Sequence, residues 1–129
     1  MATIIDALKS KMNLLAGEGV SETMITEAEK TLNLSFSSEY KEYLKTYGIA
    51  AYDGHELTGI TKSPRVNVVD VTIDERERNS EIPANLYVIE ETGVEEIVIW
   101  QSEDGKIFYS APNQELTKLC DSFAEYVLK

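Results

Sequence analysis

The residues from Val20 to Gly48 constrain the fold of this chain more than any others, because they predict two capped helices joined by a short extended crossover. Ser21 is suited to begin the first helix, since its hydroxyl can accept a hydrogen bond from an amide of the first turn. Ile25, Ala28 and Leu32 follow at helical spacing. These residues predict a helix with one buried apolar stripe.

The sequence period changes after Asn33. Leu34 and Phe36 alternate with a polar residue, which predicts an extended segment with both apolar side chains in the core. Ser37 is suited to cap a second helix. The predicted inner face of that helix is Tyr40, Tyr43, Leu44 and Tyr47. Gly48 should end it, because glycine adopts a left-handed conformation without strain.

The phrase EAEKTLNLSFSSEYKEYLKTYG resembles the N-terminal signature of the SUKH superfamily, which includes bacterial toxin-immunity proteins and a yeast regulator of cell-wall glucan synthesis. The matching positions are Glu29, Leu32, Leu34, Tyr40, Lys41, Leu44, Tyr47 and Gly48. Ser37 stands where the family usually has proline, and both residues can start a helix. Glu56 to Gly59 resembles the family's short Glu-Leu-x-Gly strand more weakly.

Other helices are predicted from local patterns. Residues 3–16 should form a first helix, with Thr3 and Asp6 as a capping pair. Its predicted apolar stripe is Ile5, Leu8, Met12 and Leu15. Residues 66–79 fit a strand by alternation or a helix by their polar start, and the resemblance favours a helix from Val68 to Asn79. Asn113 should cap a terminal helix. Its predicted stripe is Leu116, Leu119, Cys120, Phe123 and Val127.

Three strands are predicted at Leu86–Glu91, Glu96–Ser102 and Lys106–Ser110, after a shorter strand at Glu56–Ile60. Asp104-Gly105 predicts a two-residue hairpin turn of type I′, which would pair Glu103 with Lys106 and Trp100 with Tyr109. The predicted fold is therefore α+β, with N-terminal helices and a C-terminal helix packed on a mainly antiparallel β-sheet. A length of 129 residues indicates a single domain, 1–129.

Charge is the strongest compositional feature. The formal net charge is −11, so the surface should repel nucleic-acid phosphates and anionic lipid. The sequence also contains no apolar run near the roughly 20 residues that a membrane span requires. These features predict a cytoplasmic protein that binds neither nucleic acid nor membrane directly.

Side chains with reactive or metal-binding chemistry are sparse. Zinc prefers several cysteine or histidine ligands, whereas Cys120 and His55 are the only residues of these types, so we expect no metal and no cofactor. Cys120 and His55 could pair as in cysteine hydrolases, but Cys120 lies in an apolar stripe, which favours simple burial. A small hydrolase using His55 and Glu56 remains an alternative.

Acidic side chains gather in the second half of the chain. Six carboxylates fall within fifteen positions that contain no Lys or Arg: Glu90, Glu91, Glu95, Glu96, Glu103 and Asp104. They could form a surface for a basic partner, or they could be ordinary solubilising charge. A second candidate binding face is the loop that follows the two central helices, with Tyr52, Asp53, His55 and Glu56.

The resemblance implies a bacterial immunity protein, a non-enzymatic binder that occupies a cognate protein toxin, commonly a nuclease or another nucleic-acid-targeting domain. The residue chemistry agrees, because an acidic protein suits a basic nuclease domain. The alternative is a regulatory protein-binding scaffold, as the eukaryotic members of the family suggest.

Overall fold

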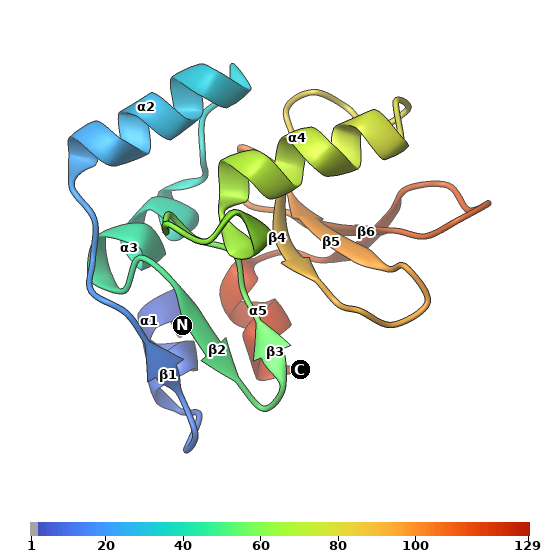
Figure 1. Ribbon diagram of the computed structural model, residues 1–129. Coiled ribbons are helices and arrows are strands. Elements are labelled where there is room, and N and C mark those ends of the chain that lie inside the picture. The colour runs from blue at the N-terminus through green and yellow to red at the C-terminus, as the bar shows by residue number, and fades with distance from the viewer. Residues whose placement is uncertain (1–2) are drawn as a thin grey trace.

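A computed structural model describes residues 3–129, which form five α-helices and two antiparallel sheets (Figure 1). The helices are α1 (Ile4–Lys9), α2 (Glu22–Leu32), α3 (Ser38–Thr46), α4 (Val68–Arg78) and α5 (Phe123–Leu128). The first sheet contains β1 (Leu15–Ala16), β2 (Ala50–Tyr52) and β3 (His55–Glu56). The second contains β4 (Tyr87–Glu91), β5 (Val98–Gln101), β6 (Ile107–Ser110) and β7 (Thr117–Cys120). The α+β prediction is confirmed, although the expected single sheet is two.

Both central helices begin and end as predicted. The Ser21 hydroxyl accepts from the Met24 amide at 3.3 Å, and the Ser37 hydroxyl accepts from the Tyr40 amide at 3.0 Å. Gly48 has a φ of +71°, and its amide donates to the carbonyl of Leu44 at 3.0 Å. These local signals succeed because caps satisfy backbone groups that the helix itself leaves unpaired.

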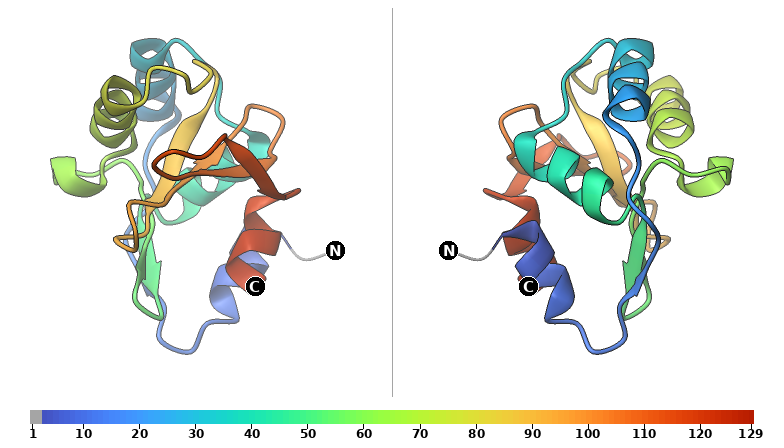
Figure 2. Two further views of the ribbon diagram at one scale, coloured as in Figure 1. Left: turned by 90° about the vertical axis from the view of Figure 1, so that its right-hand side faces the viewer. Right: turned by 90° about the vertical axis from the view of Figure 1, so that its left-hand side faces the viewer.

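The core lies on both faces of the second sheet. Residues of α1, α2, α3 and α5 pack with one face in a large apolar cluster, whereas α4 covers the other face around Trp100. α1 and α5, from the two ends of the chain, lie side by side (Figure 2). Tyr40 and Tyr43 are fully buried, and their hydroxyls bond to Thr58 at 2.7 Å, so these tyrosines pack the core.

The prediction of a helix at residues 3–16 is wrong in its second half. The Thr3 and Asp6 capping box is present, but α1 ends at Lys9. Met12 is exposed, and Leu15, 73% exposed, pairs with Ala51 in the first sheet. Residues 15 and 16 pair with β2 in place of continuing the helix. A short helix depends on packing for its stability, so a helical pattern alone does not hold these residues in a helix.

The prediction of a terminal helix from Asn113 is also wrong. Residues 117–120 form β7 against β6, and α5 begins only after Ser122, whose hydroxyl accepts from the Glu125 amide at 3.0 Å. The carboxylate of Glu39, on α3, accepts from the amides of Phe123 and Ala124 at 2.7 and 2.8 Å. Cys120 is buried as expected, although it lies on a strand.

The hairpin between β5 and β6 differs from its predicted register by one residue. Trp100 pairs with Phe108, not Tyr109, and the Ser102 amide donates to the Lys106 carbonyl at 2.9 Å. Only Gly105, with a φ of +96°, is left-handed in this turn, so Glu103 joins the loop and does not pair with Lys106. A three-residue loop with glycine in its left-handed position explains the shift.

Residues 66–79, whose sequence fits either a helix or a strand, form a helix over most of their length. α4 runs from Val68 to Arg78, and the side chain of Asn67 accepts from the Val69 amide at 3.0 Å. The short strand predicted at Glu56–Ile60 is reduced to β3, at His55–Glu56, followed by a bridge from Leu57 to Glu90. This bridge joins the two sheets.

Candidate functional site

The six carboxylates predicted as one cluster lie in three different places. Glu90 is on β4 and only 2% exposed. Glu91, Glu95 and Glu96 lie at or near the loop between β4 and β5. Glu103 and Asp104 are in the turn between β5 and β6, at the other end of β5. Because β5 separates these loops, the six residues do not form one surface.

Glu90 is held inside a polar cluster of three elements. His55 Nδ1 lies 2.9 Å from Glu90 Oε2, and the Tyr126 hydroxyl donates to Glu90 Oε1. The His55 ring stacks on buried Tyr52 with 5.0 Å between ring centroids. Burial, and then the proximity of Glu90, raise the pKa of both the Tyr52 and Tyr126 hydroxyls. The cluster therefore ties β3, β4 and α5 together, and its carboxylate is not presented to a partner.

The residues considered for a hydrolase, which are Cys120, His55 and Glu56, are not arranged as a catalytic group. A nucleophile requires a lowered pKa or an adjacent base, whereas burial raises the pKa of the Cys120 thiol. Glu56 is exposed and pairs with Arg65, whose guanidinium donates to both carboxylate oxygens at 2.7 and 2.9 Å and lowers the pKa of Glu56. His55 bonds to Glu90, so His55 and Glu56 do not act on a common point. In the loop before them, Asp53 is exposed.

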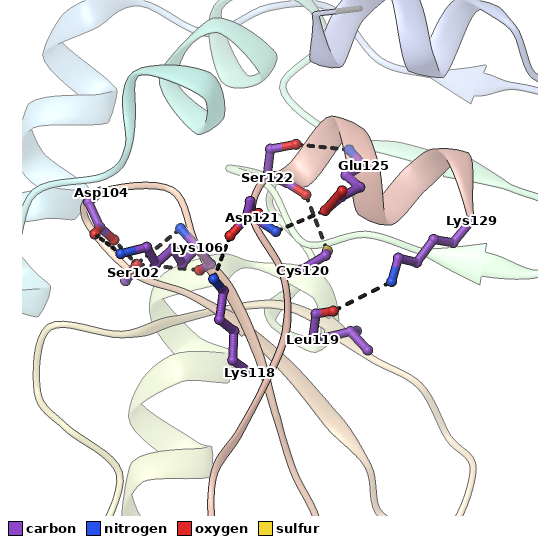
Figure 3. Close-up of polar contacts among 10 residues, drawn as sticks. All are labelled: Ser102, Asp104, Lys106, Lys118, Leu119, Cys120, Asp121, Ser122, Glu125 and Lys129. Atoms are coloured by element: carbon purple, nitrogen blue, oxygen red, sulfur yellow. Dashed lines mark hydrogen bonds and ion pairs between the residues drawn. The ribbon is translucent and has the colours of Figure 1, made fainter.

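Glu103 and Asp104 are engaged in contacts that support the fold. A carboxylate oxygen of Glu103 accepts from the Ser35 amide at 2.6 Å, which joins the turn to the crossover between α2 and α3. Asp104 accepts from the Ser102 hydroxyl and pairs with Lys106 at 3.3 Å, and these contacts lower the pKa of Asp104. Figure 3 shows this turn near the ion pair between Lys118 and Asp121. Positive charge therefore partly neutralises the acidic side chains at this end of β5.

A groove of about 890 Å³ lies among the end of α4, the β4–β5 loop and the β6–β7 loop. Its acidic lining residues are Glu75, Glu81, Glu91, Glu96 and Glu115. Arg78 is the one basic residue among its lining. We call this the acidic groove. It gathers carboxylates from three segments, of which the sequence predictions had included only Glu91 and Glu96.

Glu75 is the carboxylate of the acidic groove that burial affects most. Its side chain is 11% exposed, and one oxygen lies 3.7 Å from the guanidinium of Arg78. Burial, together with the adjacent Glu91, raises the pKa of Glu75 to about 7, and Arg78 opposes this change. The sequence contains a signal for this residue, because Glu75 lies at helical spacing from buried Val68 and Val71. Glu81 and Glu115 have no comparable sequence signal.

The β4–β5 loop that borders the acidic groove has an uncommon backbone. Glu95 and Glu96 are consecutive left-handed residues, with φ of 51° and 58°. Such conformations cost non-glycine residues about 1 kcal/mol or more each. The Thr92 hydroxyl donates to the carbonyl of Ile97 at 2.8 Å and thereby closes the loop. Both glutamates are exposed on it.

Within residues 3–129, no three His, Cys, Asp or Glu side chains are arranged to hold a metal ion. In the same part of the chain, no helix is both long enough and apolar enough to cross a membrane.

Comparisons with known proteins place this chain in a family. A crystal structure of a protein from Pseudomonas syringae pv. tomato superposes with a TM-score of 0.73 at 22% sequence identity, covering 95% of this chain and 92% of that chain. This likeness supports the fold alone. No curated protein matches the sequence. The family model described as SMI1-KNR4 cell-wall (SUKH_5) matches residues 1–129. The chain therefore belongs to the SMI1-KNR4 family of the SUKH superfamily.

Proposed function

We propose that this protein is an immunity protein, which binds a cognate bacterial toxin domain and neutralises it without catalysis. Membership of the SUKH superfamily supports this class of function. The observation that carries the proposal is the acidic groove, where carboxylates from α4, from the segment after α4, from the end of β4 and from two loops line one concave surface. A concave acidic surface complements a protein whose own surface is basic.

A nuclease toxin is the partner class that this charge suits best. A nuclease must bind phosphates, so its active-site surface is basic. The net charge of −11 would attract such a domain over a distance, and the acidic groove would then cover the surface that binds phosphate. Neutralisation in this mechanism is competition for the substrate site, and it requires no reaction. The same negative charge disfavours direct binding of nucleic acid to the immunity protein.

The test requires the cognate toxin domain, for which the candidate is the protein encoded by the neighbouring reading frame. Co-expression of the two proteins should restore the growth of cells that the toxin domain arrests. In purified form, the double variant Glu81→Lys/Glu96→Lys should associate with the toxin domain about tenfold more slowly at low salt and with a flatter salt dependence. A lack of growth rescue would refute the immunity function.

The matched control is Glu27→Lys/Glu42→Lys, which makes the same change of charge at exposed positions on α2 and α3 outside the acidic groove. This control should associate with the toxin domain at a rate close to that of the wild type, because it leaves the charges of the acidic groove unchanged. Equal effects of the two double variants would show that net charge matters but the acidic groove does not.

A regulatory scaffold is the second candidate, and the family description as SMI1-KNR4 cell-wall favours it. A scaffold would bind a client protein without protecting cells from a toxin. Growth rescue therefore separates the two candidates. The cytoplasmic location expected from the sequence suits either of them and stays a prediction.

A further inference from the structure

An open apolar hollow lies beside the acidic groove. It has a volume of about 590 Å³, and its floor is formed by Ile97, Ile99, Tyr109 and Leu119. These residues belong to β5, β6 and β7 or directly adjoin them. Ile97, Tyr109 and Leu119 are only half-buried, so the sheet presents apolar side chains to solvent here. We call this the apolar hollow.

The sheet leaves this face open because its covering helix is short. Along β5, Val98 and Trp100 face α4, whereas Ile99 faces the large apolar cluster on the other side of the sheet. On that side α5 has only six residues, and Ile97, Tyr109 and Leu119 pack at the border of the cluster without becoming buried. The apolar hollow is therefore an extension of the core face that no element of residues 3–129 covers.

The acidic groove lies on the α4 face of the sheet and the apolar hollow on the opposite face, and the two meet at the end of the sheet beside the β4–β5 and β6–β7 loops. Both are lined by Ile97, Ala111, Pro112 and Gln114. Glu95 lies on the rim of the apolar hollow, and its neighbour Glu96 lines the acidic groove. Val94, which is 60% exposed, lies on the same loop. An apolar floor thus adjoins a row of carboxylates, and neither Lys nor Arg is among the residues that line the apolar hollow.

We propose that the apolar hollow receives one apolar anchor side chain of a basic protein partner, whose flanking Lys or Arg side chains pair with Glu95 and the acidic groove. Interfaces commonly bind in this way, with an aromatic or aliphatic anchor in a pocket and a polar rim around it. This proposal rests on the proposed function and specifies how the toxin domain is held. The groove charges set the association rate, and the anchor sets the dissociation rate.

Charge complementarity selects this occupant over two others. A second copy of this protein would bring the rims of Glu95, Glu96 and Glu115 against identical rims, and like charges at close range oppose association. An anionic lipid surface would be repelled for the same reason, because the whole chain carries a net charge of −11. A cationic protein segment with an apolar side chain matches both sites, because its positive charges can pair with the acidic groove and its apolar side chain can bind in the apolar hollow.

The first test uses isotope-labelled protein and a short peptide with a central tryptophan flanked by lysines. Saturable changes in the NMR signals of Ile97, Ile99, Tyr109 and Leu119 are expected. Replacing the tryptophan by glycine, or the lysines by glutamates, should abolish these changes. Changes confined to other residues, or equal changes with the glycine peptide, would overturn the proposal.

The second test uses the cognate toxin domain and the variant Leu119→Thr, with Leu15→Thr as the matched control. Both leucines lie on strands, but Leu15 is outside the apolar hollow. Leu119→Thr should dissociate from the toxin domain about tenfold faster than Leu15→Thr, with an unchanged association rate. Glu95→Gln, at an exposed position, provides a second variant that does not touch the core, and it should slow association about twofold.

The outcomes distinguish this proposal from the proposed function. If the toxin domain is neutralised but Leu119→Thr and Leu15→Thr dissociate equally, the immunity function stands and the apolar hollow is not its anchor site. If no toxin domain is neutralised, the immunity function fails, and the peptide experiment still decides whether the apolar hollow binds a cationic segment with an apolar side chain.

Discussion

The substitution Glu75→Gln should stabilise this protein at alkaline pH and leave its stability unchanged in mild acid. The Glu75 side chain, on α4, is largely buried beside Glu91 at the end of β4, and burial together with Glu91 raises its pKa to about 7. The folded protein therefore binds a proton at Glu75 more tightly than the unfolded chain does. The stability from this proton is fully present below the ordinary pKa of 4.5 and is lost as the pH rises through about 7.

The size of the effect follows from the change in pKa. Each pKa unit corresponds to about 1.4 kcal/mol, so a rise from 4.5 to about 7 sets a ceiling of about 3.5 kcal/mol. The effect should be smaller than this ceiling, because the Glu75 carboxylate borders an open groove where water screens its charge. Glutamine keeps the shape of the side chain and carries no charge. We expect Glu75→Gln to be about 1 to 2 kcal/mol more stable than the wild type at pH values near 8.

Urea denaturation of both proteins at several pH values between about 4.5 and 8.5 measures this difference. The control is Glu77→Gln, the same chemical change at an exposed position two residues along α4. Its free energy of unfolding should follow that of the wild type at every pH. The reasoning is refuted if the gain from Glu75→Gln does not grow with pH, or if Glu77→Gln gives the same gain.

Two further predictions concern the core. Gly48→Val should lower the free energy of unfolding by about 2 to 4 kcal/mol, because φ is +71° and a Cβ atom would lie 2.5 Å from the Glu18 carbonyl oxygen; an unchanged denaturant midpoint would contradict this. The buried Cys120 thiol, whose pKa is raised, should react with a polar alkylating reagent slowly in the native protein and quickly after unfolding. Rapid labelling of the native protein would mean that Cys120 is accessible.

The parts of the fold that were predicted correctly are those that local physics specifies. Ser21, Ser37 and Asn67 cap helices because each side chain bonds to an amide two or three residues further on. The alternation of Leu34 and Phe36 marks an extended crossover, since both side chains must reach the same core. Such signals need no knowledge of distant residues.

The two helix predictions that failed depended on residues outside the predicted helices. Leu15 and Leu119 both fit a helical period, yet each lies on a strand that pairs with a strand elsewhere in the sequence. A strand gains its hydrogen bonds from its neighbour, so a helical pattern in one segment cannot exclude pairing. Glu39, which caps α5 from α3, carries no local sign of that role.

The sequence by itself determined the class of fold, the central helices, the negative charge and the resemblance to the SUKH superfamily, because these depend on neighbouring residues and on composition. Only the tertiary structure decided which carboxylates share a surface. It buried Glu90 against His55 and Tyr126, and it brought Glu75 beside Glu91. The physical reason is that an electrostatic surface depends on distances in space, and those distances are set by packing between elements that are far apart in the chain.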